Sequence, residues 1–230
     1  MKNTHSFATM PDDQNSPGAH ESGSDVPVVT RKRPKPGERK VQILQTLAAM
    51  LEQPGAERIT TAALAARLGV SEAALYRHFA SKAQMFEGLI EFIEQSVFSL
   101  VNQIAEREQA AEVVDPAAGA RNASTVVVLL LQFAEKNPGM TRVMVGDALV
   151  FENERLQQRM NQFFDKIEST LKQNLRLTAD VNGSATPSVD AQVVASALTA
   201  FAVGRLHRFA RSGFRRAPTE HLDASLALLL

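Results

Sequence analysis

The sequence predicts an all-α protein with a helix-turn-helix domain near its N-terminus and a larger helical domain behind it. Apolar residues recur at helical spacing in most segments from 38 onward, and a two-helix pattern around a glycine turn occupies residues 58–82. The first 30 residues contain few large apolar side chains. We therefore expect a disordered tail at 1–30, a basic arm and helix-turn-helix "head" at 31–82, and a regulatory and dimerisation "body" at 83–230.

The segment directly before the first helix is basic and extended. Its sequence, RKRPKP at 31–36, keeps an extended backbone because of the prolines. In isolation such a charge run would be read as a solubilising segment. Next to a helix-turn-helix, we expect Arg33 and Lys35 to contact phosphates or the minor groove. The first helix follows at about 38–53 and supports the head.

Residues 58–82 predict two short helices joined by a tight turn. Thr60 or Thr61 can cap a helix that ends at Gly69, and Ser71 is the N-cap of the next. Leu75 and Phe79 lie four residues apart and are expected to point inward. The opposite face belongs to the helix that a helix-turn-helix inserts into the major groove, and it carries Glu72, Ala73, Ala74, Tyr76, Arg77 and His78.

These residues divide into two predicted groups of DNA contacts. Hydroxyl and cationic side chains suit phosphate oxygens, whereas small side chains let a helix sit deep in the groove. The predicted phosphate contacts are Thr60, Thr61, Tyr76, Arg77 and Lys82. The predicted base contacts are Ser71, Glu72, Ala73 and Ala74, and His78 could serve in either group. The alternative is an ordinary helical hairpin, but helices of about two turns bury too little to form a core alone.

Breakers and periodicity predict the helices of the body. Ser81 caps a long fourth helix at 82–108 that joins head and body, and Pro116 and Gly119 mark the next break. A strongly apolar fifth helix at 124–136 is closed by Asn-Pro-Gly at 137–139. Further helices are predicted at 140–150, 153–177 and 189–212 and within 218–230, with a loop at 178–188.

The predicted helix at 189–212 is rich in small residues that allow close helix approach. A core helix of a monomer is the alternative interpretation. A helix-turn-helix protein, however, reads two half-sites about one DNA turn apart, so a two-fold contact is required somewhere. The expected dimer interface consists of Val194, Ala197, Leu198, Phe201 and Gly204.

Charge is unevenly distributed although the formal net charge is zero. Residues 31–82 carry ten Lys or Arg against four Asp or Glu, whereas 1–30 and 83–230 each have a net charge of −3. Binding to DNA rewards positive charge on the head through counterion release. No cysteine, signal core or apolar run near the length of a membrane span is evident, so we expect a soluble intracellular protein without membrane contact.

Sequence motifs of enzymes and cofactor sites are missing. Neither GxGxxG, GxxxxGK[ST], HExxH nor GxSxG occurs, and the five histidines are scattered without metal-ligand spacing. We therefore expect no catalytic residue, no cofactor and no metal.

The helix-turn-helix residues resemble a known family. The run LAARLGVS at 64–71, followed by LYRHF at 75–79 and Ser81-Lys82, is similar to the DNA-binding domain of the TetR family. This resemblance implies a TetR-like fold with a three-helix head, a helical body and a homodimer that presents two heads to palindromic double-stranded DNA. The usual member is a transcriptional repressor that a small-molecule ligand releases from its operator.

A longer resemblance extends through the body. Residues 87–94, 129–142 and 151–157 are similar to the SlmA group of nucleoid occlusion factors, and similarity runs from Arg39 to about Arg176. It implies a nucleoid-associated, cytoplasmic regulator that binds palindromes across the chromosome as a homodimer, with assemblies of higher order on DNA left open. It also implies contact with the C-terminal tail of the division protein FtsZ, which prevents ring assembly.

The expected site for the FtsZ tail lies between the fourth and fifth helices. Its residues are Phe92, Leu129, Phe133, Lys136 and Asn137. Their spacing is also typical of plain core, which is the alternative. Two positions depart from the family pattern: Leu100 stands where relatives have arginine near this groove, and Ala80 replaces the proline usual before Ser-Lys.

Overall fold

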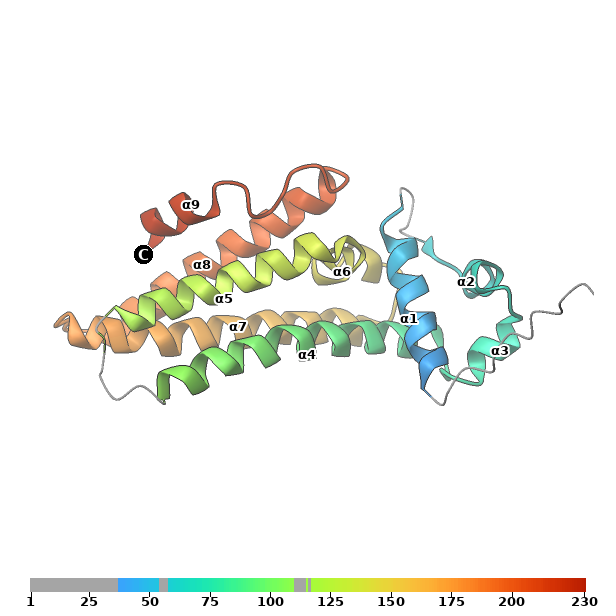
Figure 1. Cartoon of the computed structure of the whole chain (residues 1–230), viewed down its shortest axis with the longest axis horizontal. Coiled ribbons are helices and arrows are strands. Elements are labelled where there is room, and N and C mark those ends of the chain that lie inside the picture. Colours follow the sequence, from blue (N-terminus) through green and yellow to red (C-terminus); the bar gives the residue numbers. More distant parts are fainter. Residues whose placement is uncertain (1–36, 54–57, 110–114, 116) are drawn as a thin grey trace, which may run out of the picture. The chain divides into compact units, whose positions relative to one another are not determined.

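The computed structural model of the 230-residue chain describes residues 37–53, 58–109, 115 and 117–230 (Figure 1). The regular elements of these residues are helices, which confirms the all-α prediction. The predicted tail, and Arg33 and Lys35 in the basic arm, lie outside the described residues.

The head consists of α1 (Glu38–Leu51), α2 (Thr61–Leu68) and α3 (Glu72–Tyr76). α2 starts where the sequence predicts because the Thr60 hydroxyl oxygen accepts a hydrogen bond from the backbone N–H of Ala63 at 3.1 Å. It ends at Gly69, whose φ of 66° favours glycine.

α3 begins after Ser71, whose hydroxyl oxygen accepts a hydrogen bond from the backbone N–H of Ala74 at 3.3 Å. Leu75 and Phe79 are buried, as predicted, and join Leu47 and Leu64 in the core of the head. α1 packs on α2, and α2 packs on α3, so the two short helices are not held by each other alone.

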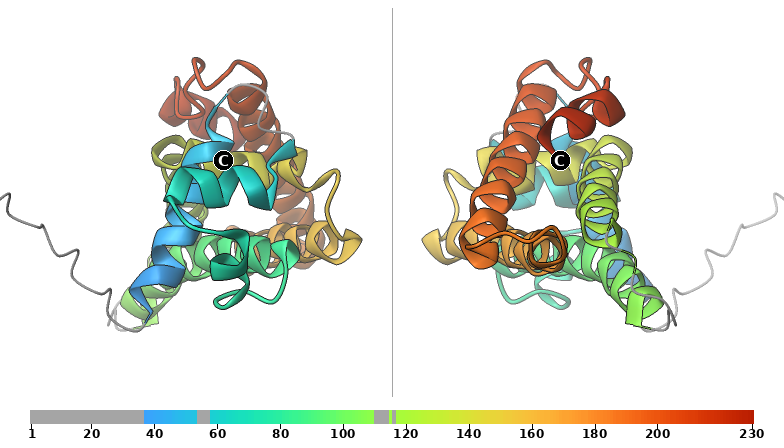
Figure 2. Two further views of the ribbon diagram at one scale, coloured as in Figure 1. Left: turned by 90° about the vertical axis from the view of Figure 1, so that its right-hand side faces the viewer. Right: turned by 90° about the vertical axis from the view of Figure 1, so that its left-hand side faces the viewer.

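The body consists of α4 (Lys82–Gln109), α5 (Ala118–Lys136), α6 (Pro138–Met144), the 3₁₀ helix η2 (Asp147–Leu149), α7 (Glu154–Val181), α8 (Pro187–Arg211) and α9 (Leu222–Leu229). α7 packs along α8 and α5, and α4 packs on α5 and α7 (Figures 1 and 2). One hydrophobic core runs from the head through α4 into α8 and α9. Head and body thus share a continuous core.

α5 starts six residues earlier than predicted, at Ala118 instead of Ser124. Gly119 does not break the helix but lies in its first turn, where an added Cβ would be 2.2 Å from the carbonyl oxygen of Asn174 on α7. The glycine is therefore explained by close helix packing. Val126 and Val127 are buried in this helix, as the helical interpretation of the valine run requires.

Two other helix boundaries differ from the prediction. The helix expected at 140–150 is α6 followed by η2, because Pro138 occupies its first turn and Gly146, with φ of 83°, ends it. α7 extends to Val181, four residues beyond the predicted end, so the loop before α8 is shorter than expected. The last helix is confined to 222–229.

α8 has a mean hydropathy of 1.3 in its most apolar stretch, and by length and composition it could cross a membrane. Its buried residues pack on α7 and α5, as in the core helix of a helical bundle. Its other face is exposed and carries small apolar side chains, which fits a contact with another protein copy.

Candidate nucleic-acid interface and partner groove

The exposed face of α3 carries the side chains predicted to contact DNA. Tyr76 is 45% exposed, and Glu72, Ala73 and Arg77 are also exposed. Ala74 and His78 are half-buried. The structure thus exposes Glu72, Ala73 and Tyr76 on α3 and Arg77 directly after it, whereas His78 lies beyond the end of this helix.

Three of these polar side chains bond to one another across α2 and α3. The Thr61 hydroxyl donates to a carboxylate oxygen of Glu72 at 2.5 Å, and the Tyr76 hydroxyl donates to the Thr61 oxygen at 3.5 Å. These bonds link the side chains of α2 and α3 at the surface. The second carboxylate oxygen of Glu72 can still accept a hydrogen bond from a cytosine amino group.

Lys82, predicted to hold a phosphate, forms an ion pair within the protein. Its ammonium lies 2.5 Å from a carboxylate oxygen of Glu152, in the segment between η2 and α7. The ammonium also lies 5.7 Å from the centre of the Phe86 ring. No sequence pattern indicates the Glu152 contact, because the two residues are far apart in the chain.

Beside this pair, the head and body make further contacts. The Arg58 guanidinium stacks on the exposed ring of Phe151 at 4.4 Å. On the other side, Gly139 of α6 packs so closely on α1 that an added Cβ would lie 2.1 Å from the Ala48 carbonyl oxygen. The position of the head thus depends on two segments of the body.

An Arg159–Glu94 pair joins α7 to α4, the helix shared by head and body. The guanidinium donates two hydrogen bonds to the carboxylate, at 3.1 and 2.6 Å. These bonds to Glu94, with the nearby charges of Glu91 and Glu87, raise the pKa of Arg159 above its already high ordinary value. A raised arginine pKa stabilises the folded state at every pH below the ordinary arginine pKa, which is about 12. The contribution of Arg159 to stability therefore does not change with pH near neutrality.

Phe92 and Phe133 form an aromatic pair between α4 and α5. Their ring centres are 6.3 Å apart, and Phe92 is 47% exposed, so it is not part of the core. Leu129 is half-buried beside them, and Lys136 is exposed at the end of α5. These residues form an apolar surface with a cationic end at the place where the sequence predicts a groove, and we call this surface the aromatic groove.

The remaining predicted groove residue also has a structural role. The Asn137 side-chain amide donates to the carbonyl oxygen of Phe133 at 2.7 Å and closes α5. Leu100, the departure from the family pattern, is 39% exposed on α4. Its side chain adds to the exposed apolar area of α4.

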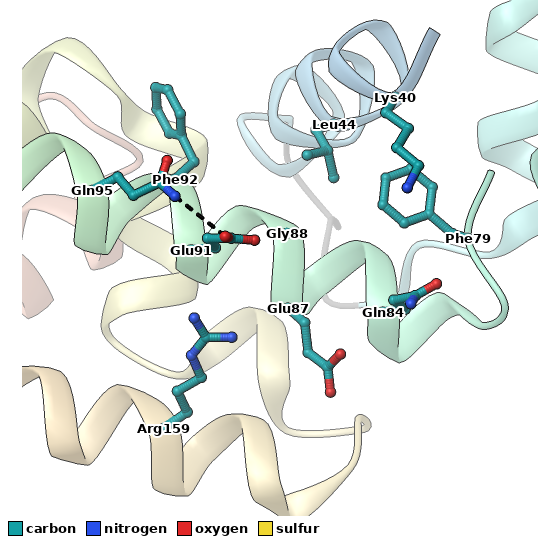
Figure 3. A pocket seen from close by; sticks show the side chains of 10 residues that line it. All are labelled: Lys40, Leu44, Phe79, Gln84, Glu87, Gly88, Glu91, Phe92, Gln95 and Arg159. Atoms are coloured by element: carbon teal, nitrogen blue, oxygen red, sulfur yellow. Dashed lines mark hydrogen bonds between the residues drawn. The ribbon is translucent and has the colours of Figure 1, made fainter. Parts of the chain in front are cut away.

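A hollow of about 490 Å³, which shares Phe92 with the aromatic groove, lies between α1, α4 and α7 (Figure 3). Charged side chains line it, including Lys40 from α1, Glu87 and Glu91 from α4, and Arg159 from α7. Figure 3 shows the Phe92 ring pointing away from the other lining side chains. Several lining residues, Glu91 and Gln95 among them, are exposed, so the hollow is a surface feature.

The predicted dimer residues on α8 do not share one environment. Leu198 is buried in the protomer's own core, and Val194 and Phe201 are half-buried against it. Ala197 and Gly204 are exposed, and an added Cβ on Gly204 would meet nothing within 4 Å. A second copy would thus meet the exposed side of this set, next to Val193 and Ala200.

A run of arginines at the end of α8 is absent from the sequence-based predictions, because the net charge of the body is negative. Arg208, Arg211, Arg215 and Arg216 are all exposed. The signal that could have found them is local: no Asp or Glu occurs between Asp190 and Glu220.

Comparisons with known proteins agree with this structure. Residues 43–89 match the family "Bacterial regulatory proteins, tetR family", and residues 121–230 match the SlmA-like family "Tetracyclin repressor-like, C-terminal domain". The chain is 51% identical to the nucleoid occlusion factor SlmA of Aliivibrio fischeri over 197 residues, which cover 85% of this chain and 96% of the relative. It is 50% identical to SlmA of Vibrio cholerae over 192 residues, which cover 83% and 93%.

Solved structures of more distant relatives share the fold. The transcriptional regulator FadR of Bacillus subtilis, solved with stearoyl-CoA, matches with a TM-score of 0.62 at 13% identity, over 82% of this chain and 96% of that one. PfmR, a TetR-family regulator of Thermus thermophilus, matches with a TM-score of 0.60 at 22% identity, over 82% and 97%. At these identities the likeness concerns the fold alone.

Proposed function

Because the chain belongs to the SlmA group of the TetR family of DNA-binding regulators, we propose that it is a nucleoid occlusion factor that acts on FtsZ. In this proposal a homodimer binds palindromic chromosomal sites through α3. While bound, it holds the C-terminal tail of FtsZ and prevents division-ring assembly over the nucleoid.

The identity of about half of all residues over most of both chains carries this proposal. The aromatic groove supports the FtsZ contact, because Phe92 is exposed where a plain core would bury it. An apolar floor beside Lys136 suits a peptide with apolar anchors and acidic flanks. The surface position of the hollow in Figure 3 also fits a protein partner better than an enclosed small-molecule pocket.

Genome-wide mapping of bound DNA tests this function against the alternative, a ligand-released repressor. Nucleoid occlusion predicts sites scattered through many genes and missing near the replication terminus. One or two promoter sites beside the protein's own gene would instead favour repression.

A second experiment tests the link between DNA and FtsZ. If bound DNA favours the state that holds the tail, the tail must tighten DNA binding by the same factor. Titration of labelled site DNA with and without the FtsZ tail peptide measures this factor. Identical isotherms would contradict the coupling.

A further inference from the structure

The loop between α8 and α9 presents exposed arginines in a fixed conformation. Arg208 and Arg211 occupy the last turn of α8, and Arg215 and Arg216 follow in the loop; we call these four the arginine surface. None of the four forms an ion pair with a carboxylate in the part of the chain that the structure describes.

The backbone that carries Arg215 and Arg216 is strained and fixed. Phe214 has a φ of 64°, which side chains other than glycine rarely adopt. Its ring meets the Phe209 ring edge to face, with the centroids 5.1 Å apart, and its centre lies 5.2 Å from the Arg142 guanidinium. The Ser212 hydroxyl oxygen accepts hydrogen bonds from the backbone N–H groups of both arginines, at 3.1 and 2.9 Å.

The far end of the loop is tied as well. Arg205 donates to the carbonyl oxygen of Glu220 at 2.5 Å and to the Ser225 hydroxyl at 2.9 Å. Thr219 donates its hydroxyl to the carboxylate of Glu135 on α5. The whole loop is therefore anchored at both ends to the body.

The position in the fold explains two of the four arginines but not the other two. Arg208 and Arg211 have a structural explanation, because cations favour a helix C-terminus. Arg215 and Arg216 lie beyond the helix. A strained backbone that holds two cations at the surface, without a carboxylate partner among the described residues, indicates a ligand.

The arginine surface lies on the head side of the body. α6 contacts both α1 and α8, and its Arg142 contacts Phe214. Figures 1 and 2 both show the loop beside α6, on the opposite side of the body from α4. It is therefore separate from the aromatic groove.

We propose that the arginine surface binds backbone phosphates of DNA in addition to the contacts made by α3. Guanidinium groups match phosphate oxygens in geometry and keep their charge. DNA held by the head raises the local concentration of phosphates at this end of the body, so even weak contacts would be occupied. An acidic protein segment is the competing ligand.

The test is the salt dependence of binding to a 40-base-pair duplex of random sequence, for which phosphate contacts dominate. The variant R215Q/R216Q should flatten the plot of log affinity against log salt by about 0.9 for each phosphate that it no longer neutralises. Its control, K172Q/R176Q, removes the same charge from α7, near the end of that helix farthest from Lys82. R215K/R216K keeps the charge and should retain most of the slope.

Each outcome decides the proposal. It is supported if only R215Q/R216Q flattens the slope while circular dichroism and sedimentation match the wild type. Equal slopes for all variants, or equal flattening in the α7 control, would overturn it. Polyglutamate serves as the probe for an acidic protein segment. If R215Q/R216Q loses polyglutamate binding without a change in the DNA slope, the surface binds an acidic protein and the proposal is overturned. The inference rests on DNA binding by the head, and failure of the wild type to bind any duplex would instead contradict the proposed function.

Discussion

The ammonium of Lys82 and the carboxylate of Glu152 form a partly buried ion pair, in which the Lys82 side chain is 29% exposed and the Glu152 side chain 10%. Lys82 begins α4, the helix that follows α3 in the chain, whereas Glu152 precedes α7. Glu152 of the body therefore pairs with the lysine that the sequence predicts to contact a DNA phosphate.

Glu152→Gln is expected to strengthen DNA binding. The substitution keeps the shape of the side chain but removes the charge that competes with phosphate for Lys82. A gain of about two- to five-fold corresponds to the usual worth of such a pair, up to about 1 kcal/mol. Fluorescence anisotropy with labelled DNA measures it. Glu154→Gln is the control, because Glu154 is exposed nearby and does not contact Lys82. An equal gain in affinity for this variant would mean that the change in net charge, and not the release of Lys82, strengthens DNA binding.

The head could be predicted from the sequence because its signals are local. Thr60, Gly69 and Ser71 each determine a helix boundary through their own side chain or backbone, and the structure places the boundaries there. The start of α5 could not be predicted, because Gly119 serves a contact with α7 that only the fold creates.

The candidate site shows the same division between local and long-range signals. The exposed face of α3 follows from helical spacing alone. The Lys82–Glu152 pair joins residues from two distant segments, and the burial of Leu198 depends on which face of α8 packs on the body. The arginine surface was not predicted because the net charge of the whole body is negative.

Arg77→Ala should weaken binding to all duplex sequences alike. Arg77 is exposed at the end of α3, and a phosphate contact carries no sequence information. The magnitude of the salt slope should fall by about 0.9 if the side chain neutralises one phosphate. Arg176→Ala on α7 serves as the control, and unchanged affinity of Arg77→Ala at moderate salt would remove this residue from the interface.

Gly139→Ala should destabilise the protein by about 1–3 kcal/mol, because the new Cβ would collide with the backbone of Ala48 in the head. Gly119→Ala makes a similar collision inside the body, against Asn174. Both variants should unfold at lower urea concentration. Only Gly139→Ala should also weaken DNA binding by the folded protein, and an equal loss in both would contradict a specific role of α6 in positioning the head.

Ala197→Arg should convert the dimer to a monomer. Ala197 is exposed on the α8 face proposed to meet a second copy, and the arginine would bring an unpaired, desolvated cation into each half of a two-fold interface. Sedimentation equilibrium measures the change in mass. Gln173→Arg adds the same charge at an exposed position of α7 and should remain dimeric; a dimeric Ala197→Arg protein would place the interface elsewhere.

FtsZ assembly in the presence of the protein and its DNA is the decisive measurement for the proposed function. Pelleting of FtsZ polymers should decrease when the wild type and a duplex from one of its mapped sites are both added. Phe92→Ala should restore pelleting, whereas Leu177→Ala, which removes a similarly exposed apolar side chain on α7 outside the groove, should not. Pelleting that is unaffected by the wild type with DNA, or equally reduced by Phe92→Ala, would contradict the assignment of the aromatic groove to FtsZ.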